Sequence, residues 1–220
     1  MQLTFSCTPS ALKNIEGTIS PARLGRYAGS AGVDKQKALQ LYVWNARLCE
    51  AFYLPIQLCE VAIRNAIHGA LENKHGDNWY ERGSFLCTLP KRLREELDGV
   101  IKDERSVYGA GMTLNHIVSG LSLGFWLHLL TKNYEGVLWP NSFATTFPNK
   151  PGHIDRDSLY NMVNSLRIHR NRIAHHKPVF DRQPTAELQN LMTLIKWVCD
   201  DTFWFTKTIS TVQQTINQRP

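Results

Sequence analysis

The segment 159-LYNMVNSLRIHRNRI-173 indicates most directly which fold the chain adopts. Its apolar residues recur at the spacing of one helix face and comprise Leu159, Met162, Val163, Leu166 and Ile173. Asp157 or Ser158 is expected to cap the helix, and Pro178 to stop it near His176. The segment therefore predicts an amphipathic helix whose apolar face is covered by other elements.

Helical periodicity continues through almost the whole chain, and alternating strand patterns are nearly absent. The expected helices run from a Ser20-Pro21 cap to about 27, from 34 to Pro55, which ends or kinks the helix, from 56 to 74, from 91 to 105, from a Thr113 cap to 130, and from a Thr185 cap to 198. An irregular connection is expected at 134–152 and an aromatic tail at 203–205. The fold class is therefore all-α: one helical-bundle domain over 20–205, with an N-terminal arm (1–19) as a helical extension and a C-terminal tail (206–220).

The composition is that of a folded protein with a mild excess of positive charge. The 220 residues carry 25 Lys and Arg against 19 Asp and Glu, a formal net charge of +6, and 43% of them are hydrophobic. No run reaches the roughly 18 apolar residues of a membrane-spanning helix, and the N-terminus has no positive charge before Lys13, so a secretory signal is not expected. We expect a cytoplasmic protein without membrane contact, for which the charge admits nucleic acid as a partner.

The five cysteines are widely scattered and include no C-x-x-C pair. The histidines outside 167–177 show no metal-ligand spacing either. We therefore expect buried free thiols, no bound metal and no cofactor.

One charged residue lies on the apolar face of the segment 159–173. With Leu166 as the origin, Arg170 falls at about +40° on the helical wheel, between Leu166 and Ile173. A buried guanidinium stays charged, so it requires an anionic partner or a phosphate-bearing ligand. The alternative is that the Arg170 side chain extends from the edge of this face into solvent.

The helix expected to begin at residue 56 carries an acid in the corresponding place. Glu60 lies about 40° from Ile56 on the inner face, and Arg64 follows one turn later and can pair with it. An acid on one inner face and a base on another predict an interhelical contact between Glu60 and Arg170.

Residues 167–177 gather four Arg or Lys and three His in eleven positions. Arg167, Arg172 and Lys177 are candidates for binding RNA phosphates, and imidazole can move protons near neutral pH. These residue types match metal-free RNA cleavage, in which a His handles the proton of the 2′- or 5′-oxygen and an Arg holds the phosphorane charge. The alternative is a solvated basic helix end, because cations favour the C-terminal end of the helix dipole.

The run Arg170-Asn171-Arg172-Ile173-Ala174-His175-His176 resembles the Arg-x4-His signature of the HEPN superfamily, and more narrowly its bacterial Abi-like (abortive infection) branch. Further similar blocks are 41-LYVWN-45, 60-EVAIRNA-66, 124-GFW-126 and 20-SPARL-24, so the resemblance covers about 20 to 204 in order. The chain departs from the pattern at Lys177, where Abi-like members usually have Glu. This substitution reverses a charge beside the motif.

The resemblance implies an α-helical, metal-independent ribonuclease that works as a homodimer. It implies Arg170, Asn171 and His175 as catalytic residues in a cleft between subunits, with Glu60 and Arg64 as a supporting Glu-x3-basic element. The function so implied is an abortive-infection or toxin effector that cleaves RNA and is silenced by an antitoxin or a regulatory RNA. The alternative is a non-catalytic HEPN module that binds RNA or a protein partner.

The helical wheel separates the two ends of the motif. On a regular helix His175 lies about 140° from Arg170, so one protomer cannot easily aim both at one phosphate. Either the last turn before Pro178 frays and swings His175, or a twofold axis places the motif of each chain against the other. His176 is a second candidate for the acid or base, and the sequence does not choose between the two histidines.

Overall fold

The computed structural model describes residues 5–32 and 34–220, and this part of the chain is helical without strands, which confirms the all-α prediction. In chain order the helices are α1 (Pro9–Ile19), α2 (Pro21–Ser30), α3 (Lys35–His75), α4 (Gly83–Leu86), α5 (Lys91–Tyr108), α6 (Leu114–Gly120), α7 (Leu123–His128), α8 (Phe143–Thr146), α9 (Arg156–Ala174), α10 (Pro184–Val198), α11 (Asp200–Ile209) and α12 (Val212–Ile216), with 3₁₀ turns η1 (Trp79–Glu81), η2 (Gly109–Gly111) and η3 (Lys132–Tyr134). Helix α1 lies in the predicted N-terminal arm, of which residues 1–4 fall outside the described part.

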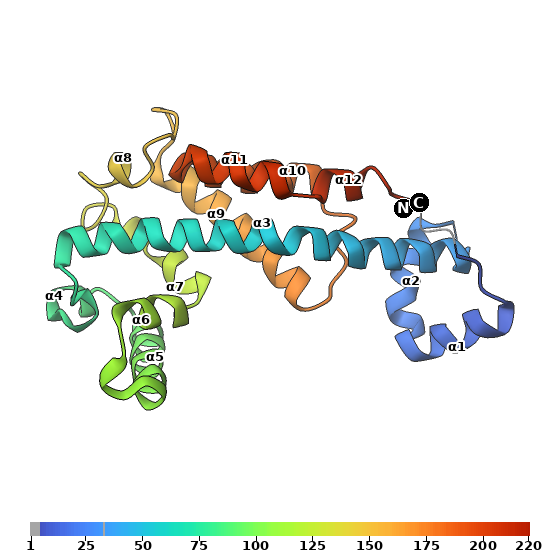
Figure 1. The fold of residues 1–220 in the computed structure, drawn as a ribbon, viewed down its shortest axis with the longest axis horizontal. Helices are drawn as coiled ribbons and strands as arrows, with labels where there is room; N and C mark the ends of the chain where they lie inside the picture. The colour runs from blue at the N-terminus through green and yellow to red at the C-terminus, as the bar shows by residue number, and fades with distance from the viewer. Residues whose placement is uncertain (1–4, 33) are drawn as a thin grey trace.

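The long helix α3 is the spine of the molecule (Figure 1). Asp34 caps it, because Oδ1 accepts the backbone N–H groups of Gln36 and Lys37 at 2.8 and 3.1 Å. The helix runs for 41 residues and ends at Gly76, whose φ of 78° suits glycine. The prediction of separate helices before and after Pro55 is wrong. Pro55 is buried inside α3, where helices packed along both halves of α3 offset the one missing backbone hydrogen bond.

The other helices cover α3 along its length. Helices α2 and α12 pack against it, α10 makes its most extensive contact, α9 crosses it, and α4 to α7 form a lobe beside its C-terminal end (Figure 1). Ser20 caps α2 as predicted, with Oγ accepting the N–H of Arg23 at 3.3 Å. The core contains the fully buried aromatic residues Trp44, Phe52, Trp79, Phe85, Phe125 and Trp126.

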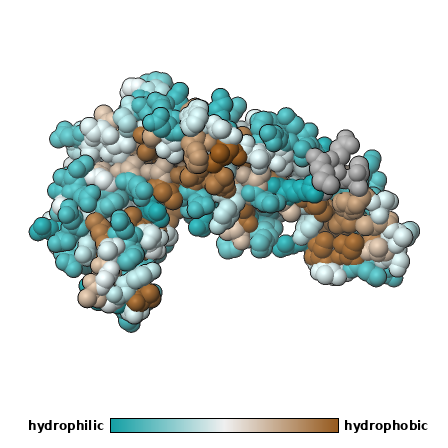
Figure 2. All heavy atoms as spheres, viewed as in Figure 1, coloured by the Kyte–Doolittle hydropathy of each residue, from teal (hydrophilic) through white to brown (hydrophobic). Residues whose placement is uncertain are grey.

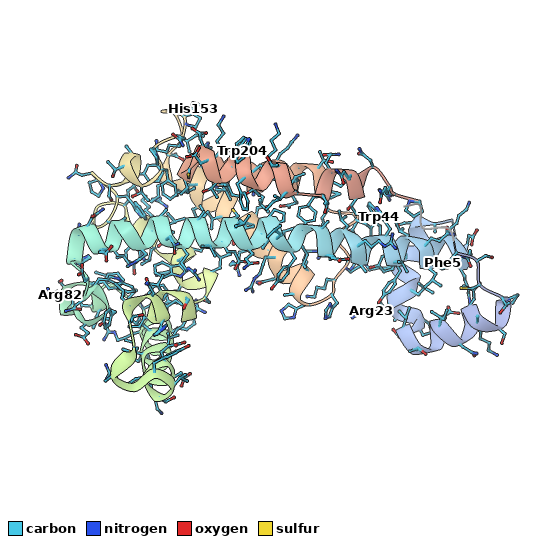
Figure 3. The ribbon with its side chains drawn as sticks, in the orientation of Figure 1. Phe5, Arg23, Trp44, Arg82, His153 and Trp204 are labelled. Carbon is cyan, nitrogen blue, oxygen red and sulfur yellow. The ribbon has the colours of Figure 1, made fainter. Side chains whose placement is uncertain are left out.

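The segment after residue 198, in which an aromatic tail was predicted, is helical and folds back as α11 and α12. Trp44, labelled in Figure 3, donates its Nε1–H to the carbonyl of Thr215 at 2.7 Å. The Arg219 guanidinium lies 5.6 Å from the centre of the same indole. The predicted Thr185 cap is also wrong: α10 begins at Pro184 and has no side-chain cap. The C-terminal residues therefore close one side of the bundle.

The single helix predicted from Thr113 to residue 130 is two helices, α6 and α7. Thr113 caps α6 as predicted. The helix stops at Gly120, where an added Cβ would lie 2.6 Å from the Val100 side chain. Ser122 then begins α7, because Glu96 Oε1 on α5 accepts the freed N–H of Ser122 at 3.0 Å. A side chain distant in sequence thus stabilises the break.

Helix α9 begins earlier than its apolar pattern suggests. Asp155 Oδ1 accepts the N–H of Ser158 at 2.8 Å, so the cap is Asp155 rather than Asp157 or Ser158. The connection predicted as irregular at 134–152 contains the short helix α8.

All five cysteines are free, yet the expectation that they are buried holds only for Cys59, and Cys87 is exposed. Within the described part of the chain, none of the helices has the length and apolar character needed to span a bilayer.

Candidate functional site

The predicted contact between Glu60 and Arg170 is confirmed where the last turns of α9 cross α3. Arg170 Nε lies 2.9 Å from Glu60 Oε1. The Arg170 side chain is 46% exposed and that of Glu60 23% exposed, so the guanidinium lies at the edge of the apolar face and not inside the core. Both proposals for Arg170 hold in part, because it has an anionic partner and also reaches solvent.

The pair lies in a cavity of about 500 Å³ between α3 and α9. The lining residues are Tyr53, Ile56, Gln57, Glu60, Val61, Arg64, Arg170, Ile173 and Ala174. Arg64 therefore shares the cavity with the Glu60–Arg170 pair. The predicted pairing of Arg64 with Glu60 is not formed among the described residues, and Arg64 Nε donates instead to Oδ1 of Asn65 at 3.5 Å. Two guanidinium groups against one carboxylate leave the cavity lining with one excess positive charge, which suits a singly charged phosphodiester.

Burial opposes ionisation of Glu60 and of Arg64 in the cavity. Burial raises the pKa of Glu60, while the charges of Arg170 and Arg64 act in the opposite direction. Burial also lowers the pKa of Arg64, and Glu60 opposes that change. The Glu60 oxygen nearest Arg170 has no aligned hydrogen bond among the described residues, so the pair is held by charge. An anion between the two arginines would supply the compensation that the single carboxylate gives only in part.

Asn171 extends this arrangement along α9. Its Oδ1 accepts a hydrogen bond from Nη1 of Arg170 at 3.3 Å. Arg170 is thus held by Glu60 on one side and by Asn171 on the other. The structure brings together four of the predicted site residues: Glu60, Arg64, Arg170 and Asn171.

His175 lies apart from these residues because α9 ends in an ordered turn. The N–H of His175 bonds to the carbonyl of Asn171 at 3.0 Å, which keeps His175 in the helical path. His176 follows with a φ of 52°, and the N–H of Lys177 bonds to the carbonyl of Arg172 at 2.8 Å, the pattern of a Schellman C-cap. The frayed turn proposed as one way to swing His175 is therefore wrong. The side chains of His175, His176 and Lys177 are all exposed, and none lines the cavity.

The other two arginines of the basic cluster are tethered within the chain. Arg172 Nε donates to the carbonyl of Pro178 at 3.1 Å, and its side chain is only 17% exposed. Arg167 donates from Nε and Nη2 to Oδ1 of Asn164 at 3.2 and 2.9 Å. Arg172 thus fixes the segment that follows α9, whereas the Lys177 side chain is exposed to solvent.

Sequence reasoning missed a role for Asn45, which anchors the segment that follows the motif. The Asn45 side chain is buried, and its Oδ1 accepts the backbone N–H groups of Val179 at 2.8 Å and Phe180 at 3.2 Å. The sequence does contain a signal for this role. Asn45 shares a helix face with Leu41 and Leu48, which are buried on α3, and a buried amide needs hydrogen-bond partners. Asn45 and Arg172 together fix the chain directly after the histidines.

His169, one of the three histidines counted in the basic cluster of residues 167–177, is buried instead of lying on the surface. Its ring packs edge-on against Phe52, with ring centres 4.7 Å apart, and the residue is 3% exposed. Neither ring nitrogen has a hydrogen-bond partner among the described residues. Burial, with a smaller contribution from the charge of Arg172, lowers the pKa of His169 to about 4, so the imidazole is neutral near pH 7. Its position on the helical wheel, beside Leu166 and Ile173, was the signal.

Fold and site define an all-helical protein with a cationic cavity between its longest helix and a late helix that carries an Arg-x4-His motif. A family model described as Abi-like protein matches residues 16–181, and the chain belongs to this family. That membership associates the protein with abortive infection. The match contains all the candidate site residues and leaves α10 to α12 outside. None of the curated proteins and none of the solved structures compared with the chain matches it.

Proposed function

We propose that the protein is a metal-independent endoribonuclease of the HEPN type and acts as an abortive-infection or toxin effector in the cytoplasm. The observation that carries this proposal is the Glu60–Arg170 pair, 2.9 Å apart, in a cavity that also holds Arg64. An arginine fixed beside a second cation suits the binding of a phosphodiester and the stabilisation of the charge of its transition state.

The proposed reaction uses the 2′-hydroxyl of the RNA as the nucleophile. A histidine takes the 2′-hydroxyl proton or protonates the leaving 5′-oxygen, water makes the other proton transfer, and His175 is the first candidate for the histidine. The 2′-oxygen bonds to phosphorus, the bond to the 5′-oxygen breaks, and the products are a 2′,3′-cyclic phosphate and a 5′-hydroxyl. Arg170 holds the charge of the phosphorane, and Asn171 and Glu60 orient Arg170.

The separation of His175 from Arg170 within one chain supports a site shared between two copies. In a twofold dimer, His175 of one protomer can meet the Arg170 cavity of its partner. RNA is then the substrate, and Arg167, Arg172 and Lys177 are candidates for contacts with its backbone. An antitoxin or a regulatory RNA is the proposed silencing partner.

A second candidate function is a non-catalytic HEPN module that binds RNA or a protein partner. It is favoured by the exposed position of His175 outside the cavity and by Lys177, which adds positive charge where Abi-like members usually have Glu.

The test is RNA cleavage by the purified protein in the presence of a chelator. Wild type, Arg170→Ala, His175→Ala and the control Arg105→Ala, which removes an exposed cation on α5, are incubated with mixed-sequence RNA. We expect new 5′-hydroxyl ends with wild type and the control, and at least a 100-fold loss with the two site variants. Loss of growth toxicity on expression should parallel loss of cleavage.

Undiminished cleavage by both site variants would refute the assignment. RNA binding without cleavage by a folded, dimeric wild type would favour the non-catalytic module. Cleavage that a chelator abolishes would point to a metal-dependent route instead.

A further inference from the structure

One stripe of α3 lines the candidate cavity from end to end. Tyr53, Gln57, Glu60 and Arg64 follow one another at the spacing of a single helix face and all line the cavity. The opposite wall is the last turn of α9, from Arg170 to Ala174. The charged residues thus occupy one end of the stripe, and an aromatic and an amide side chain occupy the other end.

The part of this stripe from Tyr53 to Glu60, the partner of Arg170, matches one nucleotide in length. Tyr53 and Glu60 are seven residues apart on α3, which is about 10 Å along the helix axis. A nucleotide bridges such a span from its phosphate to the outer edge of its base. A phosphate held by Arg170 and Arg64 therefore leaves the adjacent base beside Gln57 and Tyr53.

The end of the stripe that carries Tyr53 suits the binding of a flat, apolar surface. Tyr53 is 68% exposed, although tyrosine rings are usually covered, and the cavity lining also includes the apolar residues Ile56, Val61 and Ile173. RNA-binding proteins hold unpaired bases by stacking them on such rings and by bonding to their edges. Gln57 supplies both a donor and an acceptor, the pair of groups that recognises the edge of adenine.

We propose that this cavity is a nucleobase pocket in which Tyr53 stacks on one unpaired base and Gln57 reads its edge, with a preference for adenine. The proposal rests on the proposed function, because it takes the phosphate next to that base to be the one held by Arg170. It makes Tyr53 and Gln57 the residues that determine specificity.

The test measures binding of single-stranded RNA separately from cleavage. Ten-nucleotide 2′-O-methyl RNAs cannot react through a 2′-hydroxyl, so the wild-type protein is titrated with oligo(A), oligo(U) and an abasic strand of equal charge. We expect oligo(A) to bind roughly tenfold or more tightly than the abasic strand, with oligo(U) weaker than oligo(A). Tyr53→Ala should remove the advantage of bases over abasic sites, and Tyr53→Phe should retain it.

Two further variants separate the contributions of the pocket. Gln57→Leu should remove the preference for oligo(A) over oligo(U) and keep the preference for bases. Arg170→Ala should weaken all three strands alike. The matched control is Trp204→Ala, which removes an exposed aromatic side chain from α11, above α3 and away from the end of α9 (Figures 1 and 3). This control should change none of the ratios.

Equal binding of oligo(A) and the abasic strand by wild type, or an unchanged ratio in Tyr53→Ala, overturns the proposal. An unchanged preference for adenine in Gln57→Leu overturns the role of Gln57. Base-dependent binding by a wild type that cleaves no RNA refutes the nuclease function and leaves the base pocket supported. In an active enzyme, Tyr53→Ala should raise KM with little change in kcat, and an unchanged KM would count against the pocket alone.

Discussion

On the last turns of α9, the side chains that face α3 contact other residues of the chain, whereas those on the opposite side are exposed to solvent. On the side that faces α3, Arg170 contacts Glu60 and Asn171 and lines a cavity with Arg64. On the opposite side, Ile168 is 50% exposed and His175 is exposed. One chain therefore preorganises the group that would bind phosphate and leaves the group that would move protons facing outward.

The surface of the molecule also contains exposed apolar areas. Figure 2 shows brown areas over α10 and α11 and over α1 and α2, within a surface that is otherwise largely hydrophilic. Among the exposed large side chains, Tyr53 and Leu54 lie on α3 and Ile168 on α9, the two helices that carry the site, whereas Trp204 and Phe205 lie on α11. On α9 itself, Arg170 is paired with Glu60 on the side facing α3, whereas Ile168 on the outward side is exposed.

The largest expected effect separates the two histidines on the outward side. His175→Ala should lower the rate of RNA cleavage by about 10²- to 10⁴-fold, because it removes the proposed acid or base. His176→Gly should retain cleavage and gain up to about 1 kcal/mol of stability, because glycine tolerates the positive φ of this position. Cleavage assays and urea unfolding measure both effects. Loss of cleavage only in His176→Gly would exchange the roles of the two residues.

The next effect concerns the anchor that fixes the end of the motif. Asn45→Ala leaves the buried N–H groups of Val179 and Phe180 without their acceptor. We expect a loss of about 2–4 kcal/mol in the free energy of unfolding, measured by urea denaturation. Asn73→Ala, an exposed position on the same helix, should change stability by less than about 0.5 kcal/mol. Equal effects of the two variants would show that the anchor contributes nothing.

The buried side of α9 should make stability depend on pH through His169. As the pH falls below the ordinary pKa of 6.5, the unfolded chain gains a proton that the folded protein does not accept until about pH 4. Stability therefore decreases as the pH falls through this window, by up to about 3 kcal/mol from this residue. His169→Phe should show a correspondingly smaller decrease in unfolding experiments between pH 7 and pH 4. Parallel curves for the two proteins would contradict the burial of a neutral imidazole.

The smallest effect shows whether the Glu60–Arg170 pair serves function or stability. Burial raises the pKa of Glu60 in the folded protein above its ordinary value. The contribution of Glu60 to stability therefore decreases as the pH rises and the carboxyl group loses its proton. Glu60→Gln should therefore leave stability at pH 7 unchanged or raise it by up to about 1 kcal/mol, because Arg170 remains partly solvated. Cleavage should nevertheless fall, since Arg170 loses its orienting partner. A marked loss of stability would mean that the pair serves the fold.

Helix faces were predictable from the sequence because a regular helix fixes where each side chain points. The 3.6-residue period alone places Arg170 and Glu60 on inner faces, and their contact follows once the two helices pack. The continuity of α3 through Pro55 was not predictable, because tertiary packing offsets the local cost of the proline.

Contacts between residues distant in sequence account for the remaining differences between the predicted and the observed structure. The break before α7 depends on Glu96, which lies 26 residues before Ser122. The anchoring of Val179 depends on Asn45, which lies 134 residues earlier. No local pattern contains such pairings, so the sequence predicted the elements and the Glu60–Arg170 contact but not the turn that positions His175.

The most direct test of the account asks whether an active site takes Arg170 and His175 from different chains. Arg170→Ala and His175→Ala chains with different affinity tags are co-expressed, and the mixed dimer is purified by both tags. A shared site predicts about half of the wild-type cleavage rate, because one of the two sites is intact. It also predicts that a dimer of wild type with the double variant is inactive. An inactive mixed dimer of the single variants, together with an active dimer of wild type and double variant, would contradict the account.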